Sequence, residues 1–84
     1  MRVTFKLYAM LSDYLPDEAR KTNSLTLDVP PGRTVGQVID GFNLPPKLVH
    51  LVLVNGNYIQ PAERAGRALA EGDVLAIWPP IAGG

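Results

Sequence analysis

The sequence predicts an α+β domain in which one main helix covers one face of a mixed β-sheet. Apolar and polar residues alternate over residues 2–8 and 25–29, which is the period of half-buried strands. Apolar residues over 35–42 recur instead at helical spacing. The uninterrupted apolar runs 51–54 and 74–78 have the length of further strands. A chain of 84 residues is expected to form one such domain.

The N-terminal third is predicted to form a strand, a short helix and a second strand. In the first strand, every second residue faces the core, and these residues are Val3, Phe5 and Leu7. The short helix has an apolar face and is stopped by Pro16. The residues of that face are Met10, Leu11, Tyr14 and Leu15. Residues 16–23 are polar, so we expect an exposed connection there, and Pro30-Pro31-Gly32 ends the second strand.

The main helix is predicted to begin after Thr34, a favourable N-cap residue. Its apolar face follows the i, i+3, i+4, i+7 spacing. The residues of this face are Val35, Val38, Ile39 and Phe42. Gly41 is expected at the helix C-terminus. Pro46 then favours the first position of a short helical turn that runs through residue 50.

The last third supplies the remaining strands. The continuous apolar run 51–54 predicts a strand that is covered on both faces. Asn55-Gly56 is a typical hairpin pair, and Tyr58-Ile59 is interpreted as a short returning strand. Glu71-Gly72-Asp73 forms a turn into the last strand, 74–78, which is expected to be central. If that strand lies beside and parallel to the first, the right-handed crossover rule gives a β-grasp, or ubiquitin-like, arrangement.

Composition and charge exclude several classes of function. Eight basic and eight acidic residues give a formal net charge of zero, which argues against a nucleic-acid partner and against electrostatic attraction to a membrane. Without cysteine there is no disulfide, thiolate metal site or cysteine nucleophile, and His50 alone cannot form a zinc site. Lys47, Arg64 and Arg67 are interpreted as solvated surface, and the alternative is that they face acidic residues of a partner. Because no signal region or membrane-length apolar run is present, we expect a cytoplasmic protein.

The tail, residues 79–84, is the strongest functional signal. Pro79-Pro80 favours an extended stalk, and the terminal Gly83-Gly84 has no Cβ, so its backbone can pass through a narrow channel. Fully extended, the tail reaches roughly 20 Å. We therefore divide the chain into a folded domain, residues 1–78, and a tail that presents a terminal carboxylate to another protein. The alternative is a frayed terminus without a function.

Five segments along nearly the whole chain match a known family. They are Tyr8-Ala9, Pro31-Gly32-Arg33-Thr34-Val35, Leu53-Val54-Asn55-Gly56, Glu71-Gly72-Asp73-Val74-Leu75-Ala76 and Pro79-Pro80-Ile81-Ala82-Gly83-Gly84. On these segments the chain resembles the MoaD/ThiS sulfur carriers, and within them most of all the small subunits of molybdopterin synthase. The pair of prolines favours the molybdopterin branch over shorter thiamin-type carriers. It does not distinguish that branch from archaeal-type small modifier proteins, which end in a similar way.

The resemblance implies a chemistry for Gly84 and its neighbour Gly83. A terminal carboxylate, with a pKa of about 3.3–3.7, is ionised and is a poor electrophile until it is activated. A ubiquitin-activating-type adenylyltransferase (MoeB/ThiF-like) would use ATP and magnesium to form an acyl-adenylate at Gly84. A sulfur donor such as a cysteine desulfurase or rhodanese would convert it to a thiocarboxylate. A MoaE-like molybdopterin synthase large subunit would then hold the tail while the sulfur passes to a pterin precursor.

The same resemblance makes the chain a co-substrate rather than an enzyme. ATP and magnesium belong to the activating partner, and the chain itself is expected to bind no cofactor and no metal. Its own glycines do not form a phosphate-cradling motif. The glycines in question are Gly32, Gly36 and Gly41.

The tail alone is too short to secure a complex. Ordering six residues costs about 6–12 kcal/mol, whereas burying Ile81 returns about 1.5–3 kcal/mol. Strand parity places Tyr8 and Trp78 on the outer face of the sheet near the tail, where Tyr58 can join them. The predicted partner-binding residues are Tyr8, Tyr58, Trp78, Pro79, Pro80 and Ile81. The alternative is that Trp78 caps the core and the tyrosines cover sheet edges.

Three functions remain open, and they differ in the fate of Gly84. A sulfur carrier forms a thiocarboxylate, and this holds equally for carriers that serve thiamin, tRNA thiolation or amino-acid biosynthesis. A ubiquitin-like modifier forms isopeptide bonds with lysines of target proteins. A passive β-grasp interaction module tolerates the loss of Gly84.

Overall fold

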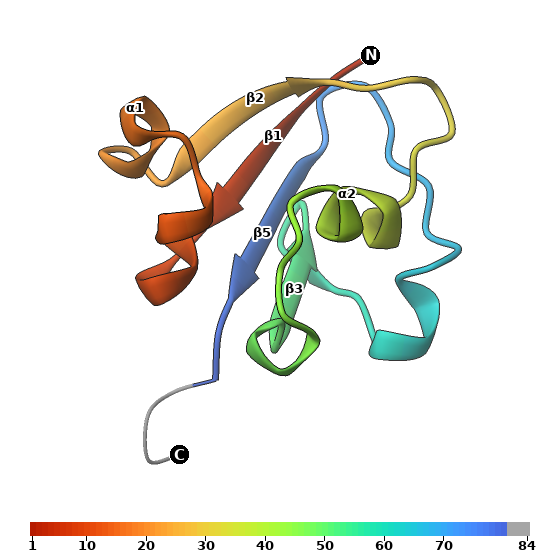
Figure 1. Cartoon of the computed structure of the whole chain (residues 1–84). Coiled ribbons are helices and arrows are strands. Elements are labelled where there is room, and N and C mark those ends of the chain that lie inside the picture. Colours follow the sequence, from red (N-terminus) through yellow and green to blue (C-terminus); the bar gives the residue numbers. More distant parts are fainter. Residues whose placement is uncertain (81–84) are drawn as a thin grey trace.

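The computed structural model describes residues 1–80 and contains a five-stranded mixed sheet with one main helix on one face (Figure 1). The strand order is β2-β1-β5-β3-β4. The strands are β1 (Arg2–Leu7), β2 (Ser24–Asp28), β3 (Leu51–Val54), β4 (Asn57–Tyr58) and β5 (Val74–Trp78). β5 is central, parallel to β1 and antiparallel to β3. The predicted α+β class, the central last strand and the β-grasp topology are therefore confirmed.

The helical elements are short. They are η1 (Ala9–Tyr14), α1 (Asp17–Arg20), α2 (Val35–Gly41), η2 (Pro46–Leu48) and η3 (Pro61–Glu63), of which α1 and α2 are α-helices and the others 3₁₀ helices. Figure 1 shows α2 lying across one face of the sheet. Pro46 occupies the first turn of η2, as predicted, although η2 ends before residue 50.

The core fills the layer between α2 and the sheet. The central strands contribute alternate residues that are fully buried, as the parity argument requires. These residues are Val3, Phe5, Leu7, Val52, Val54, Leu75 and Ile77. α2 adds Val35, Val38 and Ile39, and the ring of its C-cap residue Phe42 lies 4.6 Å from that of Phe5. Burial of these apolar side chains is what holds α2 on the sheet.

α2 begins with a reciprocal cap. The Thr34 hydroxyl accepts a hydrogen bond from the Gln37 N–H at 3.2 Å, and the Gln37 side-chain oxygen accepts one from the Thr34 N–H at 2.9 Å. This capping box satisfies helix N–H groups that have no partner within the helix. Thr34 is therefore confirmed as the N-cap, and Gln37 is a partner that the sequence analysis did not identify.

Thr34→Ala is expected to lower the free energy of unfolding by about 1 kcal/mol, because the Gln37 N–H loses its acceptor. Urea unfolding followed by circular dichroism measures this change. Thr34→Ser retains the hydroxyl and is the matched control, and it should be as stable as the original protein because Ser is at least as favourable an N-cap as Thr. Equal losses in the two variants would show that the methyl group, and not the cap, stabilises this position.

Two predictions about the N-terminal connection were wrong in part. The predicted helix after β1 is the 3₁₀ helix η1, and only part of its apolar face is buried: Met10 and Tyr14 are 56% and 38% exposed. Residues 16–23 do not form a plain exposed connection, because they contain α1, which buries Ala19. Short helices of this kind are set by tertiary packing rather than by periodicity.

The prediction that β3 is covered on both faces was also wrong. Val52 and Val54 are buried under α2, but Leu51 is 36% exposed and Leu53 is half-buried. Within residues 1–80, the buried side chains of η1, α1 and α2 all join one core cluster with Val52 and Val54, so the side of β3 that carries Leu51 and Leu53 stays open. The returning strand is shifted as well: β4 is Asn57–Tyr58, and Ile59 instead turns into the core.

A side-chain clip fixes the start of β5. Asn55 and Gly56 form the hairpin turn between β3 and β4 with φ angles of 51° and 82°. The Asn55 amide nitrogen donates to Asp73 Oδ1 at 2.8 Å, and the Asn55 amide oxygen accepts from the Val74 N–H at 2.9 Å. The other Asp73 oxygen accepts from the Ala70 N–H at 2.8 Å. The clip therefore joins the β3–β4 turn to the strand that leads into the tail.

The Asp73 contacts make stability depend on pH. The Ala70 N–H, the Asn55 amide and the charge of Arg67 hold the pKa of Asp73 below its ordinary value, against the opposing effect of burial. A lowered folded-state pKa stabilises the protein above the unfolded pKa of about 3.9, and this contribution is lost as pH falls through the folded value. We expect the urea concentration at the unfolding midpoint to decrease as the pH is lowered below about 4. In Asp73→Asn this part of the decline should disappear, and an unchanged acid profile would assign it to other carboxylates.

Candidate functional site

The tail begins at the middle of one end of the sheet. β5 ends at Trp78, whose carbonyl accepts from the His50 N–H at 3.2 Å, while the Tyr8 N–H donates to the Ile77 carbonyl at 3.2 Å. Both neighbours of β5 thus hold its last residues. Figure 1 shows this end of β5 opposite the end of the sheet at which the N-terminus lies. The first tail residues therefore leave from a fixed position.

Only the first two tail residues lie within the described structure. Pro79 is buried and Pro80 is exposed. Pro79 is thus packed against the folded domain, and Pro80 is the first tail residue with surface open to a partner. The predicted site residues Ile81, Gly83 and Gly84 lie outside the described residues.

Tyr8 and Trp78 form an aromatic stack beside the tail. Their ring centroids are 4.3 Å apart and their planes differ by 6°. Strand parity predicted that the two residues share the outer face, and the structure brings them together there. Each ring is half-buried, so the stack keeps an open side. Stacked rings restrict each other's rotamers, which gives a preformed apolar surface.

Tyr58 lies on the same face as this stack. In the register of the sheet, Leu53 is opposite both Tyr58 and Ala76, and Leu51 is opposite Trp78. Directly paired residues point to the same side of a sheet. Tyr58 is 52% exposed and lies on the edge strand β4, so it forms the outer edge of the surface. We call this surface the open face, and its residues are Tyr8, Leu51, Leu53, Tyr58, Val74 and Trp78.

Sequence reasoning missed two members of the open face and one neighbour. Leu51 and Leu53 were taken to be covered on both sides of the strand. The feature of the sequence that indicates their exposure is the number of helices, because one short main helix cannot cover both faces of a five-stranded sheet. Met10 follows Ala9, which has a φ of 52°, and η1 contacts β5. The exposed Met10 therefore lies at the end of the sheet from which the tail leaves, and its flexible thioether suits an adaptable contact.

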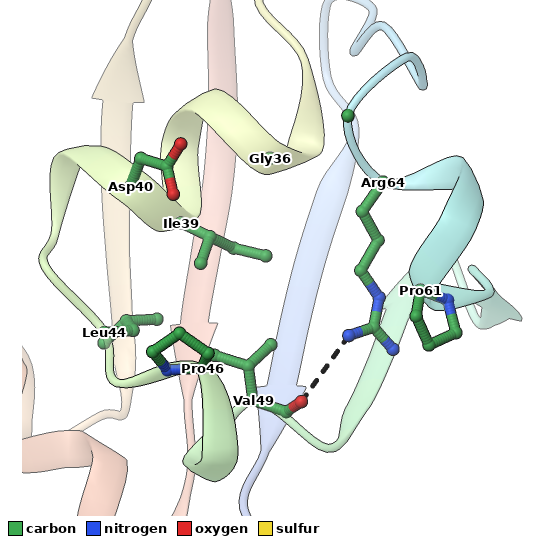
Figure 2. Close-up of a pocket in the computed structure, with 9 residues that line it drawn as sticks. Gly36, Ile39, Asp40, Leu44, Pro46, Val49, Pro61 and Arg64 are labelled. Atoms are coloured by element: carbon green, nitrogen blue, oxygen red, sulfur yellow. Dashed lines mark hydrogen bonds between the residues drawn. The ribbon is translucent and has the colours of Figure 1, made fainter.

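A groove lies on the helix side of the sheet (Figure 2). Its volume is about 510 Å³, and it lies between α2, η2 and η3, with an apolar floor that includes Ile39, Leu44 and Val49. Asp40 lies at one edge and Arg64 at the other. Among its lining residues, this pair is the only acid and base, and neither a nucleophile nor a second carboxylate accompanies it. The groove does not have the composition of a catalytic site.

Arg64 is a structural residue rather than part of a solvated surface, which corrects its interpretation from the sequence. Its guanidinium donates to three backbone carbonyls: Nε to Ile59 at 3.1 Å, Nη2 to His50 at 3.2 Å and Nη1 to Val49 at 3.5 Å. Figure 2 shows the bond to Val49 as a dashed line. These bonds tie η3 to the segment that precedes β3. Arg64 thereby supports the strand that borders β5.

The N-terminus of α2 has no N–H groups to offer to a phosphate. The Val35 N–H donates to the Arg67 carbonyl at 2.9 Å, and the Gly36 N–H donates to the Arg64 carbonyl at 2.8 Å. The capping box uses the next N–H group. A Cβ added at Gly36 would lie 3.2 Å from the Arg64 oxygen and from Ala65 Cα, so Gly36 permits close packing of the loop on the helix. This terminus is filled by the chain itself, unlike a phosphate-binding helix end.

Residues 1–80 contain neither a cluster of metal ligands nor a helix suited to cross a membrane. No three side chains of His, Cys, Asp or Glu gather there in a way that would hold a metal ion. In the same residues, no helix has the length and apolar character needed to cross a membrane.

Comparison with known proteins identifies relatives of the whole chain. The ThiS family model matches residues 14–84. The SAMP1 structure from Haloferax volcanii is 28% identical, with a TM-score of 0.71 over 100% of both chains. The small archaeal modifier protein 1 from Methanosarcina acetivorans is 27% identical, with a TM-score of 0.65 over 99% of this chain and 96% of that one.

A further structural match concerns the fold alone. A putative molybdopterin converting factor subunit 1 from Pyrococcus furiosus has a TM-score of 0.70 over 96% of this chain and 99% of its own, at 18% identity. A search of curated protein sequences gave no match.

Proposed function

Because the chain belongs to the ThiS family, we propose that it is a sulfur carrier whose Gly84 carboxylate is adenylated by a partner enzyme and converted to a thiocarboxylate. The family match confirms the resemblance to MoaD/ThiS carriers that the sequence analysis identified. The observation that carries the proposal is the position of the tail, which leaves the central strand beside the stacked rings of Tyr8 and Trp78.

In the proposed reaction, partner proteins supply the ATP and the sulfur, and Gly84 is the residue that is modified. A Gly84 carboxylate oxygen attacks the α-phosphorus of ATP on the activating enzyme, and pyrophosphate leaves. The terminal sulfur of a persulfide donor then attacks the acyl carbon, and AMP leaves. A thiol reduces the resulting acyl disulfide and releases the thiocarboxylate. The sulfur comes from outside because the chain has no cysteine.

The open face is the proposed docking surface for the activating enzyme. Tail binding alone returns too little free energy to offset the ordering of six residues, which costs about 6–12 kcal/mol. The open face presents apolar side chains next to the tail, with Tyr58 and Leu51 the most exposed. Aromatic residues at the centre of an interface commonly dominate its binding energy. We propose that docking of this surface places the tail in the partner's active site.

The finer proposal is a role as the small subunit of molybdopterin synthase. Pro79-Pro80 in the tail favours this branch, and the fold match to a putative molybdopterin converting factor subunit 1 is consistent with it. The thiocarboxylate sulfur would then pass to a pterin precursor on a MoaE-like large subunit. The test is single-turnover incubation of the thiocarboxylated protein with that subunit and the pterin precursor. Conversion of the thiocarboxylate back to a carboxylate, only when both are present, supports this role.

A second candidate is a protein modifier. Two structures at 28% and 27% identity carry the name of small archaeal modifier proteins, which favours this alternative. The adenylation step is common to both functions. They diverge when a lysine amine, instead of sulfur, takes the acyl group.

One experiment separates the candidates. The protein is incubated with its activating enzyme, ATP, magnesium and a sulfur donor, and its intact mass is measured. A gain that corresponds to replacement of one oxygen by sulfur supports the carrier. Higher-mass conjugates in a parallel lysate, without that gain, support the modifier. Neither product with a demonstrably active enzyme would contradict both and leave a binding module.

A further inference from the structure

The Asn55-Gly56 turn contains reactive chemistry that the proposed function does not use. Asparagine is a thermolabile residue, and attack on its side-chain amide by the next backbone nitrogen is least hindered when that next residue is glycine, which has no side chain. Asn55 is exposed. The Gly56 N–H makes no hydrogen bond within residues 1–80, so its nitrogen is not engaged elsewhere.

The clip protects this amide in the folded protein. Both polar atoms of the side chain are held: Nδ2 by Asp73 Oδ1 at 2.8 Å, and Oδ1 by the Val74 N–H at 2.9 Å. For the Gly56 nitrogen to reach Cγ, the side chain must rotate toward its own backbone, and both bonds must first break. The rate of reaction is therefore governed by opening of the clip.

We propose that Asn55 is a modification site that deamidates when the clip opens, and that its product prevents the clip from closing again. The Gly56 nitrogen bonds to Cγ of Asn55 and loses its proton, while the bond from Cγ to the amide nitrogen breaks and ammonia leaves. One water then opens the resulting cyclic imide at either carbonyl. The products are aspartate and isoaspartate, and no oxidant or reductant takes part.

The product is incompatible with the contacts around it. A carboxylate at position 55 has no proton to donate to Asp73 Oδ1, and two negative charges then face each other at hydrogen-bond distance. The other Asp73 oxygen is held by the Ala70 N–H, so Asp73 cannot turn away from this charge without losing that bond. Isoaspartate additionally inserts a carbon into the backbone of a tight turn. The start of β5 is loosened, and β5 carries Trp78 and the tail.

The effect of the product is tested with three full-length variants: Asn55→Asp, Asp73→Asn and the double variant. Asn55→Asp is expected to lower the urea unfolding midpoint. The double variant should recover most of that loss, because an amide at position 73 can donate to a carboxylate at position 55. A midpoint for Asn55→Asp equal to that of the original protein, or no recovery in the double variant, would overturn the proposal.

The protection is tested by following deamidation directly. The original protein and Asp73→Asn are incubated in native buffer at mildly alkaline pH, and peptides containing Asn55 are analysed for deamidation by mass spectrometry. We expect several-fold faster deamidation in Asp73→Asn, and equal rates when both proteins are unfolded in urea. Asn57, which precedes Tyr58, is the internal control and should remain intact. Equal native rates, or equal reaction at Asn57, would contradict a guarded site at Asn55.

Discussion

Deleting Gly84 is expected to abolish thiocarboxylate formation while the free energy of unfolding stays within about 0.5 kcal/mol of the original. The deletion leaves a carboxylate on Gly83 but shortens the tail by about 3.3–3.6 Å. A misplacement of about 1 Å at a reacting centre can already lower a rate by about a hundredfold. Within residues 1–80, the buried apolar core runs from Val3 to Ile77, and we expect it to form without Gly84.

Intact mass after reaction with the activating enzyme, ATP, magnesium and a sulfur donor measures this loss, and thermal unfolding measures stability. The matched control is a chain extended by one glycine after Gly84, which retains Gly84 but displaces the carboxylate in the opposite direction. This extended chain should also fail to form a thiocarboxylate if the partner requires a fixed distance between the folded domain and the terminal carboxylate. Formation of a thiocarboxylate on Gly83 at the original rate would show that tail length does not matter.

Alternation was sufficient to predict β1 because a one-layer core requires every second residue to face it. Val3, Phe5 and Leu7 in β1 obey this rule. The same logic was insufficient for β3 and β5, where every residue is apolar. Such a run does not say how many faces are covered, and Leu51 proved to be on an uncovered one.

Only the part of the candidate site that follows from strand parity could be predicted from the sequence. Parity placed Tyr8 and Trp78 on one face, and the observed stack follows from their adjacent positions in parallel strands. The partnership of Asn55 and Asp73 joins residues 18 positions apart, and each was interpreted separately as a turn residue. The three carbonyl partners of Arg64 come from two segments, one with Val49 and His50 and the other with Ile59, and they depend on the folded loop. Contacts between irregular segments have no periodic signal in the sequence.

Trp78→Ala is expected to weaken binding to the activating enzyme by about 2 kcal/mol or more, roughly 30-fold in Kd. The ring is half-buried beside the tail and is positioned by its stack on Tyr8. Its removal takes away the largest apolar side chain of the open face and frees the Tyr8 ring to change rotamer. Isothermal titration calorimetry with the activating enzyme, in the absence of ATP, measures the docking step without the chemistry.

Matched variants separate docking from stability. Trp78→Ala also loses the stack with Tyr8, so we expect a stability cost of about 1–2 kcal/mol, and its folded state is verified at the titration temperature. Tyr58→Ala removes a ring that is 52% exposed and should weaken binding with little loss of stability. Thr26→Ala alters an exposed β2 residue paired with Thr4 and should change neither. Normal binding by Trp78→Ala, or failure of that variant to fold, would instead assign Trp78 to the core and place docking elsewhere.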